Sequence, residues 1–159
     1  MTKSSDVAFI KPPRTLQDKV LTDDGTKPNF DAAADAVRDL AREFVLRLPQ
    51  DIFAIEQDLI SLKEDSSNTA LRSVLFRRVH DLKGQAGTYD YWMITVIGNE
   101  LCRFIEHTSV MTPRHFKLMH YHIEALKMVV VKRMTGKNPD GGQRMIDTLH
   151  GMAAKVLQD

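Results

Sequence analysis

The stretch that decides the fold is Leu71–Tyr91, with the sequence LRSVLFRRVHDLKGQAGTYDY. At 100° per residue, its apolar side chains recur on one side of a helix, as expected for a stripe that faces a core. These residues are Leu71, Leu75, Val79, Leu82, Ala86 and Tyr89. His80 points almost the opposite way, among small residues and cations. We therefore predict an exposed histidine on an open, positively charged face.

Two glycines, Gly84 and Gly87, follow His80 on the same helix. A glycine inside a helix costs about 1 kcal/mol relative to alanine, and it usually marks a place where another group approaches the backbone. A neutral imidazole is a nucleophile, and a nearby ammonium group such as that of Lys83 neutralises the charge of an attached phosphoryl group. This pattern indicates capture of a phosphoryl group by His80.

The run His80-x-Leu82-Lys83-Gly84-x-Ala86-Gly87 resembles the signature of the histidine-containing phosphotransfer (HPt) domains of multistep two-component relays. That signature is a histidine, any residue, Leu-Lys-Gly, and a small residue two positions further on. The resemblance implies that His80 is the phosphoacceptor and that Lys83 assists it. It also implies close approach and docking of a partner at four residues: Phe76, Arg77, Gly84 and Gly87.

One position departs from the family pattern. A glycine usually closes the motif ten residues after the histidine, and this chain has Asp90 there. Aspartate tolerates the left-handed backbone conformation better than most residues, so we expect the helix break to survive. The departure affects the loop that follows rather than the phosphoacceptor.

Length and composition favour one soluble domain. The 159 residues suffice for a single core, and the net charge of +1 gives no overall attraction to nucleic acid or to anionic lipid. The only cysteine, Cys102, excludes an internal disulfide and fits a reducing compartment. No apolar run of about 18 residues and no signal peptide is visible. We therefore expect a cytoplasmic protein without nucleic-acid or membrane partners.

The N-terminal residues 1–28 are polar, contain several prolines and show no sustained period, so we predict an extended or disordered arm. Within it, Val7–Ile10 is apolar enough to dock on the domain or on a partner. Residues 29–159 form a single helical domain in this prediction. Its first helix ends near Pro49, and a second helix follows directly with Pro49 in its first turn.

The remaining helices are predicted from their caps and apolar faces. Asn68 caps the helix that carries His80, after a polar turn. The next helix is Trp92–His107, with a core face of Met93, Ile94, Ile97, Leu101, Phe104 and Ile105. Thr112 and Pro113 start another helix, which we expect to end at a Gly136 cap. A last helix covers residues 143–157.

The HPt resemblance implies an all-α fold, namely an antiparallel four-helix bundle over about residues 49–136, with additional N-terminal and C-terminal helices. In that fold the helix after the histidine helix runs back beside it. Asn99, Cys102 and Arg103 are therefore candidates to orient the imidazole or to meet the phosphoryl group. The alternative is that these side chains only form a solvated polar stripe. Cys102 does not suit a role in orienting the imidazole, because a thiol is a weak hydrogen-bond partner.

Metal and nucleotide chemistry find little support in the sequence. Four histidines are near one another, but none pairs with another at i, i+4, no Glu-x-x-His pair shares a face, and one cysteine excludes a structural zinc site. These histidines are His107, His115, His120 and His122. We predict no metal. No glycine loop cradles a nucleotide, so the chain is not a kinase, and His80 receives its phosphoryl group from another protein.

The predicted function is that of a phosphoryl carrier between receiver domains of response regulators, or from the receiver of a hybrid histidine kinase to a final regulator. The receiver supplies Mg²⁺, and the chain needs no cofactor of its own. One alternative is a helical interaction module that binds a receiver or kinase and alters its signalling without carrying phosphate. Another is an enzyme with His80 as general base, which requires a concave pocket rather than a convex ridge.

Overall fold

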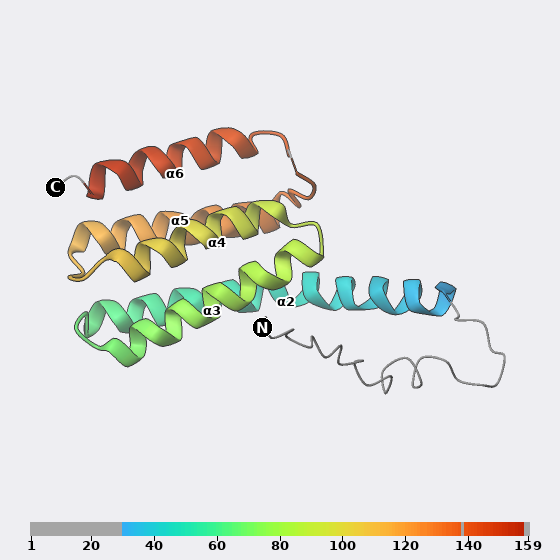
Figure 1. Ribbon diagram of the computed structural model, residues 1–159, viewed down its shortest axis with the longest axis horizontal. Coiled ribbons are helices and arrows are strands. Elements are labelled where there is room, and N and C mark those ends of the chain that lie inside the picture. Colours follow the sequence, from blue (N-terminus) through green and yellow to red (C-terminus); the bar gives the residue numbers. More distant parts are fainter. Residues whose placement is uncertain (1–29, 138, 158–159) are drawn as a thin grey trace, which may run out of the picture. The chain divides into compact units, whose positions relative to one another are not determined.

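The computed structural model describes residues 30–137 and 139–157, and these residues form helices and turns without a strand (Figure 1). The helices are α2 (Phe30–Glu64), α3 (Thr69–Thr88), α4 (Trp92–His107), α5 (Pro113–Val131) and α6 (Gly142–Leu157). The all-α prediction is confirmed. None of these described helices combines the length and apolar character needed to cross a membrane. The predicted arm at residues 1–28, with Val7–Ile10, lies outside the described residues.

The chain divides into two units between Arg38 and Asp39. In the first unit, the described beginning of α2 carries an exposed ion pair in which Arg38 Nη2 lies 2.8 Å from Asp35 Oδ1, one turn earlier. The second unit contains the remainder of α2 and the other four helices. It also contains the whole stretch that carries His80.

Helix α2 runs through Pro49 without interruption, so the predicted division into two helices at this proline is wrong. A proline inside a helix removes one hydrogen bond and costs about 3 kcal/mol. Because proline has no N–H, the carbonyl of Val45 lacks its usual helical donor. Pro49 and Val45 are both exposed, so water can donate to this carbonyl instead. The opposite side of α2 is a continuous buried stripe: Phe44, Leu48, Ile52, Ile55, Leu59 and Leu62. Burial of apolar side chains before and after Pro49 offsets the cost of the proline. The helix predicted to end near Pro49 is therefore the first part of α2.

Helix α2 packs antiparallel to α3. Near one end of the pair, the rings of Phe44 and Tyr89 stack with their centroids 4.7 Å apart. Near the other end, Arg78 Nε donates a hydrogen bond to Asp58 Oδ2 at 2.6 Å. Residue numbers decrease along α3 as they increase along α2, so the two helices run antiparallel.

Helix α3 begins at its predicted cap and buries its predicted stripe. The Asn68 Oδ1 atom accepts hydrogen bonds from the backbone N–H groups of Ala70 and Leu71, each at 3.1 Å. These bonds satisfy two donors that the first turn of a helix leaves unpaired. The fully buried residues of α3 are Leu75, Val79, Leu82 and Ala86. The other two members of the stripe, Leu71 and Tyr89, are half-buried against the same core.

Helix α4 returns antiparallel to α3. The hydroxyl of Thr95 donates to the carbonyl of Lys83 at 3.0 Å, and further along, Cys102 Sγ lies 4.0 Å from the carbonyl oxygen of Phe76. The core face predicted for α4 is confirmed, since all six of its residues are buried. The α3–α4 pair therefore presents the outer face of α3 beside the polar edge of α4.

Helices α5 and α6 complete the second unit (Figure 1). α5 packs against α4, where the rings of Phe104 and His115 lie 5.4 Å apart. It also contacts α2 through Lys127 Nζ, which is 2.7 Å from Glu56 Oε1. α6 packs against both α5 and α4, and it buries Ile146 and Leu149 as part of the core.

Helix α5 ends at Val131, so the predicted end at Gly136 is wrong. Arg133 adopts a φ of 48°, and the N–H of Met134 donates to the carbonyl of Val129 at 2.9 Å. This is a Schellman motif, which usually has glycine at the left-handed position. Burial of Met134 in the core compensates for an arginine there. Because an arginine holds this position, a search of the sequence for a capping glycine misses the C-terminal end of α5.

Asp90 closes α3 in the left-handed conformation, with a φ of 63°. The N–H of the buried Tyr91 donates to the carbonyl of Ala86 at 3.0 Å, and the carbonyl of Asp90 accepts from the N–H of Gly136 at 2.9 Å. The expectation that aspartate preserves the helix break is confirmed. The backbone geometry is the one that glycine adopts without strain.

We predict that Asp90→Gly stabilises the protein. Removing the Cβ relieves the cost of the left-handed conformation, and we expect the free energy of unfolding to rise by about 0.5–1 kcal/mol. Urea denaturation followed by circular dichroism measures this change. Asp81→Gly is the matched control, because Asp81 is exposed and helical on the same helix; it is expected to lower the stability by about 0.3–1 kcal/mol. A lower stability of Asp90→Gly contradicts the strain argument.

Candidate functional site

His80 lies on the outer face of α3, with 56% of its side chain exposed, as its place in the helical pattern predicts. Its Nδ1 atom is 3.9 Å from Oδ1 of the exposed Asp81. That distance is too long for a hydrogen bond. A neutral imidazole carries a free electron pair on one of its two ring nitrogens. The chemistry available here is nucleophilic attack on an electrophile that arrives from solvent.

The half-buried Phe76 lies one turn before His80, and the two rings are stacked. Their centroids are 5.9 Å apart and their planes differ by 29°. Phe76 also packs against the core, so it supplies a fixed wall beside the imidazole. An aromatic surface next to an exposed nucleophile suits contact with another protein.

Lys83 and Asn99 are brought together across the two helices. The Lys83 ammonium donates a hydrogen bond to Asn99 Oδ1 at 2.8 Å. Lys83 is half-buried and follows His80 by three residues, so both side chains emerge on neighbouring parts of α3. An ammonium has three donors, and the bond to Asn99 leaves two for the oxygens of an incoming anion.

Cys102 is buried, with 3% of its surface exposed, and its Sγ lies against the backbone of Phe76. Burial raises the pKa of this thiol to about 11. The group therefore stays protonated at neutral pH and is a poor nucleophile. It acts as a small packing residue between α3 and α4, and it does not belong to an exposed polar face.

The two arginines among the predicted site residues are both exposed. Arg77 precedes His80 on α3 and adds positive charge to that surface. Arg103 of α4 lines a cavity together with residues of α5 and α6. In the part of the chain that the structure describes, no hydrogen bond or ion pair joins Arg103 to His80.

The two glycines of the motif differ in their surroundings. A Cβ at Gly84 would have no atom of another residue within 4 Å, so the backbone there faces open space. A Cβ at Gly87 would lie 3.4 Å from Thr95 Oγ1, which is ordinary van der Waals contact. Open backbone next to His80 is therefore a property of Gly84.

A third glycine, Gly98 of α4, is important for the site and was not singled out from the sequence. A Cβ there would lie 2.8 Å from Cβ of Lys83, closer than real Cβ contacts come. Gly98 thus sets the close approach of α4 to α3 at the residue that bonds Asn99. Its signal in the sequence is a lone glycine inside an otherwise apolar helix, which often marks such an approach.

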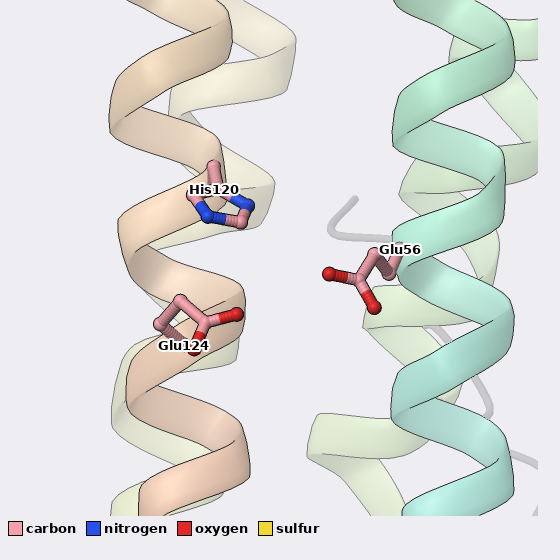
Figure 2. A group of neighbouring side chains, drawn as sticks. All are labelled: Glu56, His120 and Glu124. Atoms are coloured by element: carbon pink, nitrogen blue, oxygen red, sulfur yellow. The ribbon is translucent and has the colours of Figure 1, made fainter.

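One group of side chains on another face has the donor atoms of a metal site. Figure 2 shows Glu56 of α2 opposite His120 and Glu124 of α5, and their donor atoms lie within 4.8 Å of one another. The Lys127 ammonium lies 2.7 Å from Glu56 and 2.8 Å from Glu124. This one ammonium bonds to both carboxylates and offsets one of their two negative charges, so these residues form an ion-pair cluster.

Comparison of the chain with models of known families, with curated proteins and with solved structures finds no match. Function is therefore inferred from the chemistry of His80 and its surroundings. The features that matter are the exposed imidazole, the ammonium of Lys83 held by Asn99, and the open backbone at Gly84.

We predict opposite effects of alanine at two helical glycines. Gly98→Ala forces α4 away from Lys83 and is expected to lower the free energy of unfolding by about 1–3 kcal/mol. Gly84→Ala meets no neighbour and is expected to raise it by up to about 1 kcal/mol, because alanine favours the helix. Urea denaturation of both variants measures the difference. Equal stabilities would mean that the α3–α4 contact relaxes without cost.

Proposed function

We propose that the chain is a histidine phosphotransfer protein that carries a phosphoryl group on His80 in a multistep two-component phosphorelay. The observation that carries this proposal is an exposed imidazole on a helix whose neighbouring Lys83 ammonium is held at 2.8 Å from Asn99. The resemblance of the His80–Gly87 run to the HPt signature supports the same assignment.

The proposed architecture is an antiparallel four-helix bundle of the HPt type, made by α2 from Asp39 onward, α3, α4 and α5. The antiparallel contacts of α3 with α2 and with α4 support it, as do the contacts of α5 with α4 and α2. α6 is the additional C-terminal helix. Such a bundle carries the histidine on the outer face of one helix, where a partner protein can reach it.

In the proposed transfer, Nε2 of His80 attacks the phosphorus of a phosphoaspartate on a receiver domain in line with the bond that breaks. The new N–P bond forms as the P–O bond to the aspartate breaks, and the aspartate leaves as a carboxylate. The ring keeps its proton on Nδ1, so the phosphorylated imidazole is cationic. Lys83 neutralises part of the charge on the equatorial oxygens, and the receiver supplies Mg²⁺.

The partners in this proposal are receiver domains, including that of a hybrid histidine kinase. The open backbone at Gly84 gives room for the loops around the phosphoaspartate, and Phe76, Arg77 and Gly87 extend the docking surface. The contact is modest in size because a carrier must release its partner. The chain is a carrier rather than an enzyme with its own nucleotide site, and its proposed compartment is the cytoplasm.

The first test is phosphotransfer from a panel of phosphorylated receiver domains to the wild-type chain and to His80→Gln. We expect acid-labile, base-stable phosphate on the wild-type chain and none on the variant, because glutamine has no nucleophilic nitrogen. His120→Gln, on α5, is the control and is expected to transfer normally. The interaction module would be favoured instead if a receiver binds both the wild-type chain and His80→Gln but transfers phosphate to neither of them.

We expect Lys83→Ala to slow the transfer by about 10–100-fold without unfolding the protein, since it removes one electrostatic contact to the reacting group. Single-turnover kinetics with a phosphorylated receiver measures the rate. Asn99→Ala is the companion variant, because it keeps the ammonium but frees it from its partner on α4; a smaller decrease is expected. An unchanged rate in Lys83→Ala would remove this residue from the site.

A further inference from the structure

A cavity of about 340 Å³ lies where α4, α5 and α6 meet, away from the α3 surface that carries His80. Its lining includes a carboxylate and three imidazoles: Glu100, His107, His122 and His150. The proposed phosphotransfer uses none of these four residues. Their donor atoms therefore need an explanation of their own.

His122 is the most constrained of these side chains. Only 1% of its side chain is exposed, and its Nδ1 atom lies 2.9 Å from the backbone carbonyl of Leu118. Such a bond requires a proton on Nδ1, which leaves the electron pair of the neutral ring on Nε2. Nε2 is buried and has no hydrogen-bond partner. A backbone carbonyl on one nitrogen and a free second nitrogen is the arrangement typical of a histidine that binds a metal.

Glu100 of α4 lies between two imidazoles. Its Oε2 atom is 3.5 Å from His122 Nε2, and its Oε1 atom is in contact with Nε2 of His150 on α6. Both carboxylate oxygens are buried, and neither accepts a hydrogen bond of good geometry. In a buried place, an electron pair on His122 Nε2 that faces the Glu100 carboxylate is repelled by it, and a cation between the two, either a proton or a metal ion, removes the repulsion.

The separation of the two donor atoms is compatible with a metal ion between them. An N–H···O hydrogen bond spans about 2.7–3.2 Å, which is shorter than the observed 3.5 Å. Zinc lies about 2.0–2.2 Å from nitrogen and oxygen ligands, so two ligands of a tetrahedral site are about 3.4 Å apart. The spacing between Glu100 and His122 fits the metal.

We propose that Glu100, His122 and His150 bind a divalent transition-metal ion of the zinc class. Two imidazoles and one carboxylate form a donor set that such ions prefer. The three donor atoms do not all lie within 4.8 Å of one another in this structure, because the carboxylate separates the imidazoles. Binding therefore requires a turn of the His150 side chain, which is 59% exposed and lines the cavity.

The metal would fasten α6 to the rest of the second unit. Its three ligands come from three helices, with Glu100 on α4, His122 on α5 and His150 on α6. A bond to the metal cross-links these three helices in addition to the contacts that already join them. Binding to the folded chain alone also stabilises it by mass action.

The test measures Zn²⁺ and Co²⁺ binding by the full chain without an affinity tag. We expect Zn²⁺ to raise the melting temperature and Co²⁺ to give the visible absorption bands of a tetrahedral site. His150→Ala is the decisive variant, since an exposed side chain can be removed without unfolding the protein. We expect it to weaken Co²⁺ binding at least about tenfold, because even the loss of an outer-shell partner costs ~10–100-fold. Glu100→Gln is expected to weaken binding as well.

The chain offers a matched control in His120→Ala. His120 is also on α5, and it belongs to the ion-pair cluster in Figure 2. Metal binding by this variant is expected to equal that of the wild-type chain. Three results overturn the proposal: no saturable binding by the wild-type chain, unchanged binding by His150→Ala, or binding that is lost in His120→Ala.

Discussion

The close approach of α4 to α3 at Gly98 is the constraint on which the His80 surface depends. The backbone of α4 passes so near Lys83 that no side chain fits between them, and the hydroxyl of Thr95 bonds to the Lys83 carbonyl in the same place. The next residue of α4, Asn99, can then reach the Lys83 ammonium. A wider separation would leave that long, flexible side chain without its partner and would cost entropy to hold it near His80.

Signals that act within a few residues were readable from the sequence. The stripe of α3, the Asn68 cap, the start of α5 at Thr112 and the bounds of α4 all agree with the structure, because each depends on side-chain spacing or on one local hydrogen bond. The exposed position of His80 on the outer face of α3 was predicted in the same way, since it follows from the helical pattern of its neighbours. The left-handed conformation of Asp90 also follows from its own side chain.

Features decided by tertiary packing were not readable. Pro49 signals a helix boundary by itself, yet buried residues on both sides keep α2 continuous. Arg133 takes a position usually held by glycine because Met134 is buried beyond it. Glu100 pairs with His122 and His150, which lie 22 and 50 positions further along the chain. No periodicity within one helix reveals such a group.

Consecutive residues of α4 serve two different places in the molecule. Asn99 reaches the Lys83 ammonium on one side, and Glu100, rotated by about 100° around the helix, meets the imidazoles of His122 and His150 on another. Any cation that fixes Glu100 therefore also fixes the backbone that presents Asn99 and Gly98 to α3. A cross-link at α6 would in this way restrict motion of α4 relative to α3. The rigidity of the Lys83–Asn99 pair then depends on both faces of α4, and not only on the contact at Gly98.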